Sequence, residues 1–385
     1  MDCGGMNDLL KVHLESKTNL GDDELFRFGL GMSRISNGGE VNANTVEGRL
    51  RTLRDLTENF KVLVDTSPIY GNGLSEEILK QPLSEKRDQI YLATKYYPQD
   101  HHKNLDLIQS IDLSLGRMGV EHIDLLQIHF PNPLCRFESI AEGLQSLILA
   151  GKIKNVGLSN YTPRESQDLI ELYPNIEFLT NQIEVYLTNI EILNSFNKSS
   201  FSKILTYGSL LQGRLAATEK QRILLKKIGH EFNLSAAAVT ILMLLEINSE
   251  VLPILRISQH KNLEEFMKIF AIKFEESVYL RFANSFQEDI KYVEHSRIKL
   301  IGDNYRAPYL KLEEALINMQ ELFPSPAAFA ARILKFDIEF PLKVRDLGNG
   351  TYEIDTADPF DQIKKYWAYR IAKPHENIPV TIVEP

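Results

Sequence analysis

Residues 89–129 read QIYLATKYYPQDHHKNLDLIQSIDLSLGRMGVEHIDLLQIH and contain the pattern that decides the fold. Two short apolar runs, Gln89–Tyr96 and Ile123–His129, are typical of buried strands. Between them, Leu105–Met118 carries apolar residues at intervals of three and four, which predicts an amphipathic helix. A helix-sized connection allows the two flanking strands to pair in parallel. The stretch therefore predicts a strand, a helix and a second, parallel strand.

The same alternation continues on both sides of this stretch. Six further strands are predicted at Leu25–Met32, Lys61–Ser67, Asn155–Ser159, Phe178–Glu184, Ile204–Gly208 and Val251–Ile257. Helices are predicted at Thr45–Asn59 and Ser139–Ala150, and another after Thr162, an N-cap followed by proline. Eight strands alternating with helices fit a closed barrel or an open doubly wound sheet. Because no Gly-x-Gly-x-x-Gly follows the first strand, we predict an α/β fold of the (β/α)8 TIM-barrel type.

Composition restricts the classes of function. The chain has 385 residues, of which 43% are hydrophobic, and a formal net charge of -9. An acidic chain is a poor match for the phosphate backbone, so we expect no nucleic-acid partner. It has no apolar run of about 20 residues and no visible secretory signal, so we expect no membrane span and a cytoplasmic location. The two cysteines, Cys3 and Cys135, are then expected to be reduced thiols.

Polar residues gather at one kind of position in this pattern. They fall at or just past the C-terminal ends of predicted strands: Asp65, Lys95, His129, Ser159, Asn160 and Gln182. Each has an ordinary structural explanation alone, such as capping a turn or filling a core. Together they lie on the face of a barrel where active sites are built. The sequence therefore predicts a functional site on that face.

Four stretches resemble the aldo-keto reductases. They are VDTSPIYGNGLSEEIL, ATKYYP, IDLLQIHFP and GKIKNVGLSNY, which begin at Val64, Ala93, Ile123 and Gly151. The resemblance runs from about Leu25 to about Phe270. It implies a barrel enzyme, an oxidoreductase acting on CH–OH groups, that moves hydride between a nicotinamide cofactor and an aldehyde, ketone or alcohol.

The resemblance also implies four catalytic residues: Asp65, Tyr70, Lys95 and His129. Tyr70 would be the general acid, although an ordinary tyrosine with a pKa near ~10 gives up its proton reluctantly. The Lys95 ammonium would favour the phenolate form of Tyr70 and so lower its pKa. Asp65 would hold Lys95 through a charge-assisted hydrogen bond. His129 would orient the substrate oxygen and donate a hydrogen bond to it.

The cofactor contacts follow from the same resemblance. Ser159, Asn160 and Gln182 would bind the nicotinamide carboxamide, and Tyr207 would stack beneath the ring. The remaining candidates are Gly31, Leu210, Gly213, Arg256, Ser258 and Asn262. Arg256 would meet the 2′-phosphate, because arginine suits planar phosphate contacts; NADP is therefore predicted, with NAD as the alternative. The chain departs from the family at Gly208-Ser209, often Ser-Pro, at Asn262, often arginine, and at Phe266, often an asparagine near the adenine.

The last hundred residues leave the barrel pattern. We predict a barrel domain over residues 1–290 and a small α+β domain over 291–385. FPLKVRDLGNGTYEIDT, which begins at Phe340, predicts a hairpin, Asp361–Ala372 a helix, and IPVTIVEP a final strand. This order weakly resembles the ParB-like nuclease fold. The Gly-x-x-Arg box of that fold should lie near Asp355–Asp358, which reads Asp-Thr-Ala-Asp here, so its chemistry would be lost. An unrelated appendage is the alternative.

Three classes of function compete at this point. A reductase is favoured. A non-catalytic barrel that binds a nicotinamide cofactor, as a sensor or a subunit, is opposed by retention of all four catalytic residues. A nucleic-acid-directed role of the C-terminal domain is opposed by the acidic balance. The expected partner is a small carbonyl or alcohol, sugar-like or aromatic, in a pocket lined by Tyr96, Tyr97, Phe130 and Pro131. Substrate identity, the direction of the reaction and assembly, for which a homodimer is one alternative, stay open.

Overall fold

The computed structural model describes most of the chain up to residue 281 and three strands near the C-terminus. The described residues are 16–37, 40–98, 106–130, 137–161, 163–187, 193, 196, 200–210, 213, 215, 219–272, 274, 277–278, 281, 340–348, 351–355 and 380–383. Several predictions lie outside them: both cysteines, Pro131, the N-cap at Thr162 and the helix at Asp361–Ala372. The chain divides into two compact units near residue 290, and each is described here by itself.

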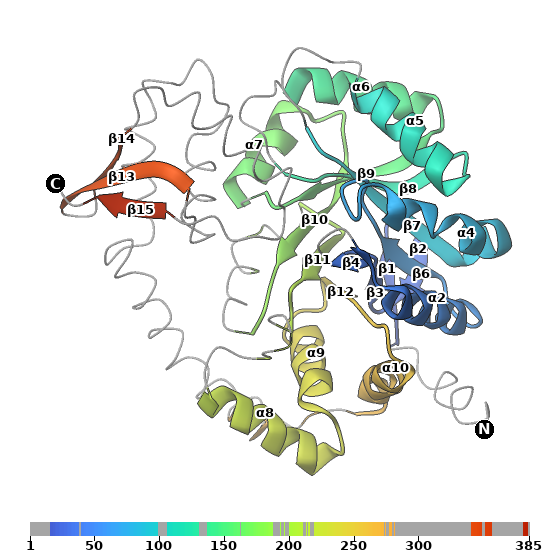
Figure 1. Cartoon of the computed structure of the whole chain (residues 1–385), viewed down its shortest axis with the longest axis vertical. Coiled ribbons are helices and arrows are strands. Elements are labelled where there is room, and N and C mark those ends of the chain that lie inside the picture. The colour runs from blue at the N-terminus through green and yellow to red at the C-terminus, as the bar shows by residue number, and fades with distance from the viewer. Residues whose placement is uncertain are drawn as a thin grey trace. The chain divides into compact units, whose positions relative to one another are not determined.

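The first unit is a closed barrel of eight parallel strands (Figure 1). In chain order they are β3 (Gly29–Gly31), β6 (Val62–Asp65), β7 (Ile90–Tyr96), β8 (Ile123–Ile128), β9 (Ile153–Ser159), β10 (Phe178–Glu184), β11 (Lys203–Tyr207) and β12 (Val251–Leu255). The last strand, β12, pairs with β3 and closes the ring. The predicted (β/α)8 TIM barrel is therefore confirmed.

Helices surround the barrel on its outside (Figure 1). They are α2 (Ala43–Thr57), α3 (Leu74–Glu77), α4 (Lys80–Lys86), α5 (Asp106–Met118), α6 (Phe137–Leu149), α7 (Pro163–Leu172), α8 (Glu219–Phe232), α9 (Ala236–Ile247) and α10 (His260–Met267). Two of them begin with side-chain caps: the Asn42 side chain accepts from the Thr45 N–H at 3.0 Å, and the Ser235 hydroxyl accepts from the Ala238 N–H at 3.1 Å.

No single helix in the described part of the chain is long and apolar enough to cross a membrane. The helices α8 and α9 meet that requirement of length and composition only when they are taken together, and they are bent by 91° relative to each other.

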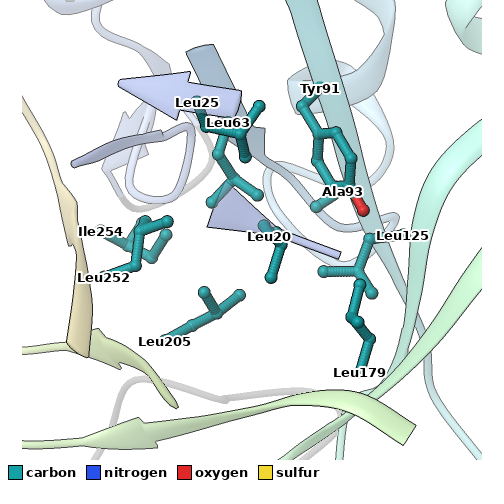
Figure 2. Packing of buried hydrophobic residues seen from close by; sticks show 10 residues of the cluster. All are labelled: Leu20, Leu25, Leu63, Tyr91, Ala93, Leu125, Leu179, Leu205, Leu252 and Ile254. Atoms are coloured by element: carbon teal, nitrogen blue, oxygen red, sulfur yellow. The ribbon is translucent and has the colours of Figure 1, made fainter. Parts of the chain in front are cut away.

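The predicted strand Leu25–Met32 is wrong in its extent. The run is divided into β2 (Asp23–Phe26) and β3, and β2 forms a hairpin with β1 (Lys17–Leu20) around the left-handed Gly21, whose φ is 58°. The reason is packing: both Leu20 and Leu25 are buried in a cluster with apolar residues from six of the barrel strands, β6, β7, β8, β10, β11 and β12 (Figure 2). The hairpin thereby closes the N-terminal end of the barrel and leaves the C-terminal end for the polar residues.

The second unit contains a three-stranded sheet in the order β14-β13-β15. Here β13 (Phe340–Gly348) pairs antiparallel with β14 (Thr351–Asp355) and parallel with β15 (Val380–Val383). The predicted hairpin and final strand are confirmed. A sheet of this kind is compatible with many small α+β domains, so the ParB-like kinship and the boundaries of the two domains stay predictions.

Candidate active site

The four predicted catalytic residues come together at the C-terminal end of the barrel. Asp65 is the last residue of β6, Lys95 lies one residue before the end of β7, and His129 directly follows β8. Tyr70 lies in the loop between β6 and α3. Each is buried, with less than a tenth of its surface exposed. The parallel order of β6, β7 and β8 brings their ends to the same edge, which is why residues 64 positions apart in the chain meet.

Asp65 and Lys95 form a buried ion pair. The Lys95 Nζ donates to both carboxylate oxygens of Asp65, at 2.6 and 2.7 Å, and to the Thr66 carbonyl at 3.0 Å. Two amide side chains, Gln127 Nε2 at 3.1 Å and Gln182 Nε2 at 2.8 Å, donate to Asp65 Oδ1. Burial lowers the pKa of Lys95, while the charge of Asp65 and its hydrogen bonds raise it. The carboxylate therefore keeps an ammonium in the barrel interior that burial alone would tend to neutralise.

The ring of Tyr70 lies directly over this pair. Its centroid is 4.9 Å from Lys95 Nζ and 5.9 Å from the centroid of the His129 ring, edge to face. Burial raises the pKa of Tyr70 well above its usual value; Asp65 raises it further and Arg256 lowers it. The structure thus differs from the expected lowering of the Tyr70 pKa by Lys95, because burial of the phenol, and after it the charge of Asp65, raise that pKa. A tyrosine in this state holds its proton at neutral pH, which suits a proton donor.

His129 is enclosed by aromatic rings. It stacks on Phe130 with centroids 4.7 Å apart, and Tyr97 contacts it with centroids 5.8 Å apart. On the other side, His129 Nδ1 lies 3.4 Å from the Ser67 hydroxyl. Tyr97 and Phe130 thus lie beside the histidine, as predicted for pocket residues. Tyr96 follows Lys95 in the same strand, and strand alternation directs neighbouring side chains to opposite faces, so its place in the pocket stays a prediction.

The predicted nicotinamide contacts also lie together. The backbone N–H of Asn160 donates to the Gln182 carbonyl at 2.8 Å, and its side-chain Nδ2 donates to the His129 carbonyl at 3.0 Å and to the Ser159 hydroxyl at 3.1 Å. The Tyr207 hydroxyl donates to Asn160 Oδ1 at 2.6 Å. Asn160 has a left-handed backbone, with φ of 64°, which asparagine tolerates better than most residues. These four residues are therefore fixed beside His129 as one polar cluster.

Arginines gather near the end of β3. Arg49 Nη1 donates to the Gly31 carbonyl at 3.2 Å and to the Ser33 carbonyl. Burial and the charge of Arg256 lower the pKa of Arg49 to about 10. Burial and the charge of Arg34 lower the pKa of Arg256, and Tyr70 raises it. Arg256 Cγ lies 3.5 Å from where a Cβ on Gly31 would stand. The site therefore has a basic edge, although the chain is acidic overall.

Leu210 and Gly213 lie in the loop after β11. The Gly213 N–H donates to the Leu210 carbonyl at 2.8 Å, which closes a turn, and Gly213 has φ of 94°. A Cβ built on Gly213 would meet no atom within 4 Å, so the glycine is required by backbone conformation rather than by crowding.

The segment after β12 carries the other predicted adenosine contacts. Ser258 packs against α2 so closely that a Cβ on Gly48 would come within 1.9 Å of the Ser258 carbonyl oxygen. The Asn262 N–H donates to the Gln259 carbonyl at 2.9 Å in the first turn of α10. Phe266, which stands where the family often has an asparagine, is buried, with its ring centroid 6.3 Å from that of Phe28. Its apolar ring is stabilised in the interior, where the amide of an asparagine would need hydrogen-bond partners.

The profile of the Aldo/keto reductase family matches residues 27–285. The chain belongs to this family. The aldo-keto reductase YhdN of Bacillus subtilis is 33% identical over 208 residues, which are 50% of this chain and 60% of YhdN. The chain thus spans less than two thirds of that relative. The 6-dehydroglucose reductase of Agrobacterium fabrum is 30% identical over 257 residues, 60% of this chain and 84% of that protein.

Solved structures of aldo-keto reductases show the same fold. An aldo-keto reductase from Klebsiella pneumoniae, in complex with NADPH, superimposes with a TM-score of 0.63 at 20% identity over 71% of this chain and 96% of that one. The thermostable aldo-keto reductase Tm1743 gives a TM-score of 0.61 at 21% identity over 70% and 99% of the two chains. At this identity the likeness shows the fold alone.

Sequence reasoning missed three residues of this aldo-keto reductase site. Gln127 lies in a predicted buried strand, and it pairs in register with Lys95 and so points into the same interior. Glu76 belongs to the family signature, which does not indicate that its side chain is fully buried. Arg49 looked like an ordinary helix residue, and no pattern in the sequence indicated that it binds the carbonyls at the end of β3.

Proposed function

We propose that this protein reduces an aldehyde or ketone to an alcohol with NADPH, or catalyses the reverse oxidation. One observation carries the proposal: the Asp65–Lys95 ion pair, at 2.6 Å, lies beneath the Tyr70 ring at the C-terminal end of the barrel, with His129 beside it. A phenol, an ammonium and an imidazole directed at one place are the groups that addition of hydride to a carbonyl requires.

The chemistry of the chain's own residues is proton transfer and orientation. When bound, the nicotinamide cofactor supplies hydride to the carbonyl carbon. Tyr70 donates its proton to the carbonyl oxygen as the charge on that oxygen develops. Lys95, held by Asp65, stabilises the phenolate that remains, and His129 donates a hydrogen bond to the same oxygen. One aldehyde, one NADPH and one proton give one alcohol and one NADP+, and solvent returns the proton to Tyr70.

The residues present fit a cofactor that carries phosphates. Arg34, Arg49 and Arg256 make the edge next to Gly31 positive, and guanidinium groups match phosphate oxygens in geometry. Ser159, Asn160, Gln182 and Tyr207 present amide and hydroxyl groups beside His129. We propose that these four hold the nicotinamide end and that Gly31, Leu210, Gly213, Arg256, Ser258 and Asn262 line the path of the phosphates and adenosine. NADPH is the proposed cofactor because Arg256 offers a charge for the 2′-phosphate.

The proposed substrate is a small polar carbonyl, sugar-derived or of the glyoxal type. Support comes from the relatives, which include a 6-dehydroglucose reductase and the methylglyoxal reductase YeaE of Escherichia coli. The aromatic rings of Tyr97 and Phe130 beside His129 offer flat apolar faces, against which a sugar ring or a short aldehyde can pack. The cytoplasmic location, the homodimer and the ParB-like kinship stay predictions.

The test is loss of NADPH absorbance with a panel of aldehydes: methylglyoxal, glyoxal, an oxidised glucose derivative and an aromatic aldehyde. Turnover by the wild-type protein that is lost in Tyr70→Phe supports the proposal. NADPH binding without turnover on any member of the panel would instead favour the alternative, a cofactor-binding barrel with no catalytic role.

A further inference from the structure

The loop that carries Tyr70 is held by more than its own backbone. Its chain passes through left-handed conformations at Gly71, Asn72 and Gly73, with φ of 61°, 55° and 93°. The Ser75 N–H donates to the Tyr70 carbonyl at 3.2 Å, which closes the loop on itself. Backbone turns of this kind set the shape of the loop, but they do not fix its position relative to the strand that carries Lys95.

One anchor ties the loop to the strands on its near side. The Ser75 hydroxyl donates to the Met32 carbonyl at 3.0 Å and lies 2.6 Å from the Thr66 hydroxyl. Met32 follows β3 and Thr66 follows β6, so Ser75 joins the loop to the ends of two neighbouring strands. This anchor uses neutral groups only.

A second anchor is an ion pair in which the Glu76 side chain is fully buried and the Arg117 side chain is 23% exposed. Glu76 accepts from the Thr94 hydroxyl through Oε1 at 2.6 Å and from Arg117 Nε through Oε2 at 2.6 Å. Arg117 lies in the last turn of α5, donates from Nη2 to the Ser114 hydroxyl at 3.0 Å, and passes beneath the loop, with Cδ 3.0 Å from where a Cβ on Gly73 would stand.

Thr94 links this second anchor to the strand that carries Lys95. Thr94 directly precedes Lys95 in β7, and neighbouring residues of a strand point to opposite faces. Lys95 therefore points into the barrel toward Asp65, while Thr94 points outward to Glu76. A single strand segment thus connects the ammonium beneath the Tyr70 ring with the carboxylate that holds the Tyr70 loop. The charge of Glu76 also reaches the interior, since it is among the groups that oppose the lowering of the Lys95 pKa by burial.

We propose that Glu76, with Arg117 and Thr94, is a positioning residue of the reduction: it fixes the Tyr70 hydroxyl relative to Lys95 and the substrate oxygen. Glu76 does not touch the reacting atoms. The proposal rests on the proposed reductase function and extends it to residues outside the barrel mouth. A displacement of the proton donor by about 1 Å is enough to lower a rate constant about a hundredfold, so a buried anchor one strand residue away from Lys95 controls kcat.

The chain offers a matched control for the test. Glu77 is the next residue of α3 and is exposed, so Glu77→Gln makes the same chemical change one position along. Glu76→Gln removes the charge that Arg117 binds and keeps the side-chain size. Thr94→Val is a milder variant, which removes only the hydroxyl donor. Arg117→Lys keeps the positive charge and should restore part of the effect relative to Arg117→Met.

Five quantities are measured for each variant: kcat and KM with a small aldehyde, the NADPH dissociation constant, the primary isotope effect with 4-deuterated NADPH, and the fraction of protein that binds NADPH. We expect Glu76→Gln to lower kcat about tenfold or more, to change the NADPH dissociation constant less than twofold, and to raise the isotope effect, because the chemical step becomes slower. Glu77→Gln should behave as the wild type does.

Two results with Glu76→Gln would overturn the proposal. A kcat for Glu76→Gln within twofold of that for Glu77→Gln would overturn the proposal. So would a loss of kcat that only follows the loss of NADPH-binding protein, with an unchanged isotope effect, since that marks a merely structural role. If Glu76→Gln does not fold, Thr94→Val decides: a raised isotope effect supports the proposal and wild-type values refute it. Failure of the reductase function itself would show as no turnover by the wild-type protein.

Discussion

Replacement of Asp65 by asparagine tests the ionic centre of the site. The variant keeps the size of the side chain and one carbonyl oxygen, but it removes the charge that holds Lys95. The Lys95 side chain has no exposed surface, so water cannot take the place of the carboxylate. Breaking a buried ion pair from one side costs about 3–5 kcal/mol, because the remaining charge is left unpaired. We expect Asp65→Asn to lower the free energy of unfolding by about that amount.

The control is the ion pair between Lys61 and Asp23, which has a similar length of 2.5 Å but whose side chains are 27% and 31% exposed. Pairs that water can reach contribute about 1 kcal/mol or less. Asp23→Asn should therefore cost less than about 1 kcal/mol in urea unfolding, the assay for both variants.

The pH dependence of stability distinguishes the loss of the buried Asp65–Lys95 pair from the loss of the exposed Asp23–Lys61 pair. Without Asp65, burial lowers the pKa of Lys95 with less opposition than in the wild type. The unfolded chain then binds more protons than the folded chain below the ordinary lysine pKa of about 10.4. Stability of Asp65→Asn should therefore rise as the pH is raised toward that value, because stability increases with pH wherever the unfolded state holds more protons. Equal, pH-independent losses in Asp65→Asn and Asp23→Asn would refute the reasoning.

Three further predictions concern single residues. Tyr70→Phe should lower the rate of carbonyl reduction about 10²–10⁴-fold with nearly unchanged NADPH affinity. Because the pKa of Tyr70 is raised, the rate of reduction by the wild type should stay constant through neutral pH, while the rate of the reverse oxidation should rise with pH. Arg256→Ala should weaken binding of NADPH more than that of NADH by about 1.5–3 kcal/mol in fluorescence titrations; equal weakening would remove Arg256 from the 2′-phosphate. Burial raises the pKa of Asp124, but hydrogen bonds from Arg87, the Leu92 N–H and Lys154 outweigh burial, so the net pKa is below its usual value. The ionised carboxylate therefore stabilises the fold above about pH 4, and this stabilisation is lost as the pH falls through the folded pKa. The stability of Asp124→Asn should fall less steeply in acid than that of the wild type, and an equally steep fall would contradict this role of Asp124.

The sequence predicted the barrel well because its pattern is repeated eight times. Seven of the eight strands lie within two residues of their expected bounds, as Phe178–Glu184 does. The first strand failed because Leu25, Phe26, Phe28 and Leu30 make one apolar segment interrupted only by Arg27 and Gly29, and such a segment does not reveal where the chain leaves one sheet and enters another. Burial of Leu20 and Leu25 against strands far along the chain decides that point, and only the folded structure contains it.

The catalytic residues were predictable because their types and order form a motif, while the residues that hold them were not. Gln127 and Glu76 support Asp65 and the Tyr70 loop through contacts between segments that are 62 and 18 positions apart. Strand alternation could have indicated Gln127 as an interior residue, but nothing local shows that a Glu in a short helix becomes fully buried.

The charged residues around Tyr70 set the pKa of this proton donor. Burial, and after it the Asp65 carboxylate, raise the pKa of Tyr70 in this structure, and Arg256 lowers it from the basic edge. A bound cofactor would bring negatively charged phosphates to that edge, and these would offset the positive charge of Arg256 that acts on Tyr70. Because these negative charges would weaken the lowering by Arg256, the pKa of Tyr70 would be higher with the cofactor site occupied than with it empty. A difference in the tyrosine titration between the protein alone and the protein with NADP+, abolished in Arg256→Ala, would show this coupling, and identical titrations would exclude it.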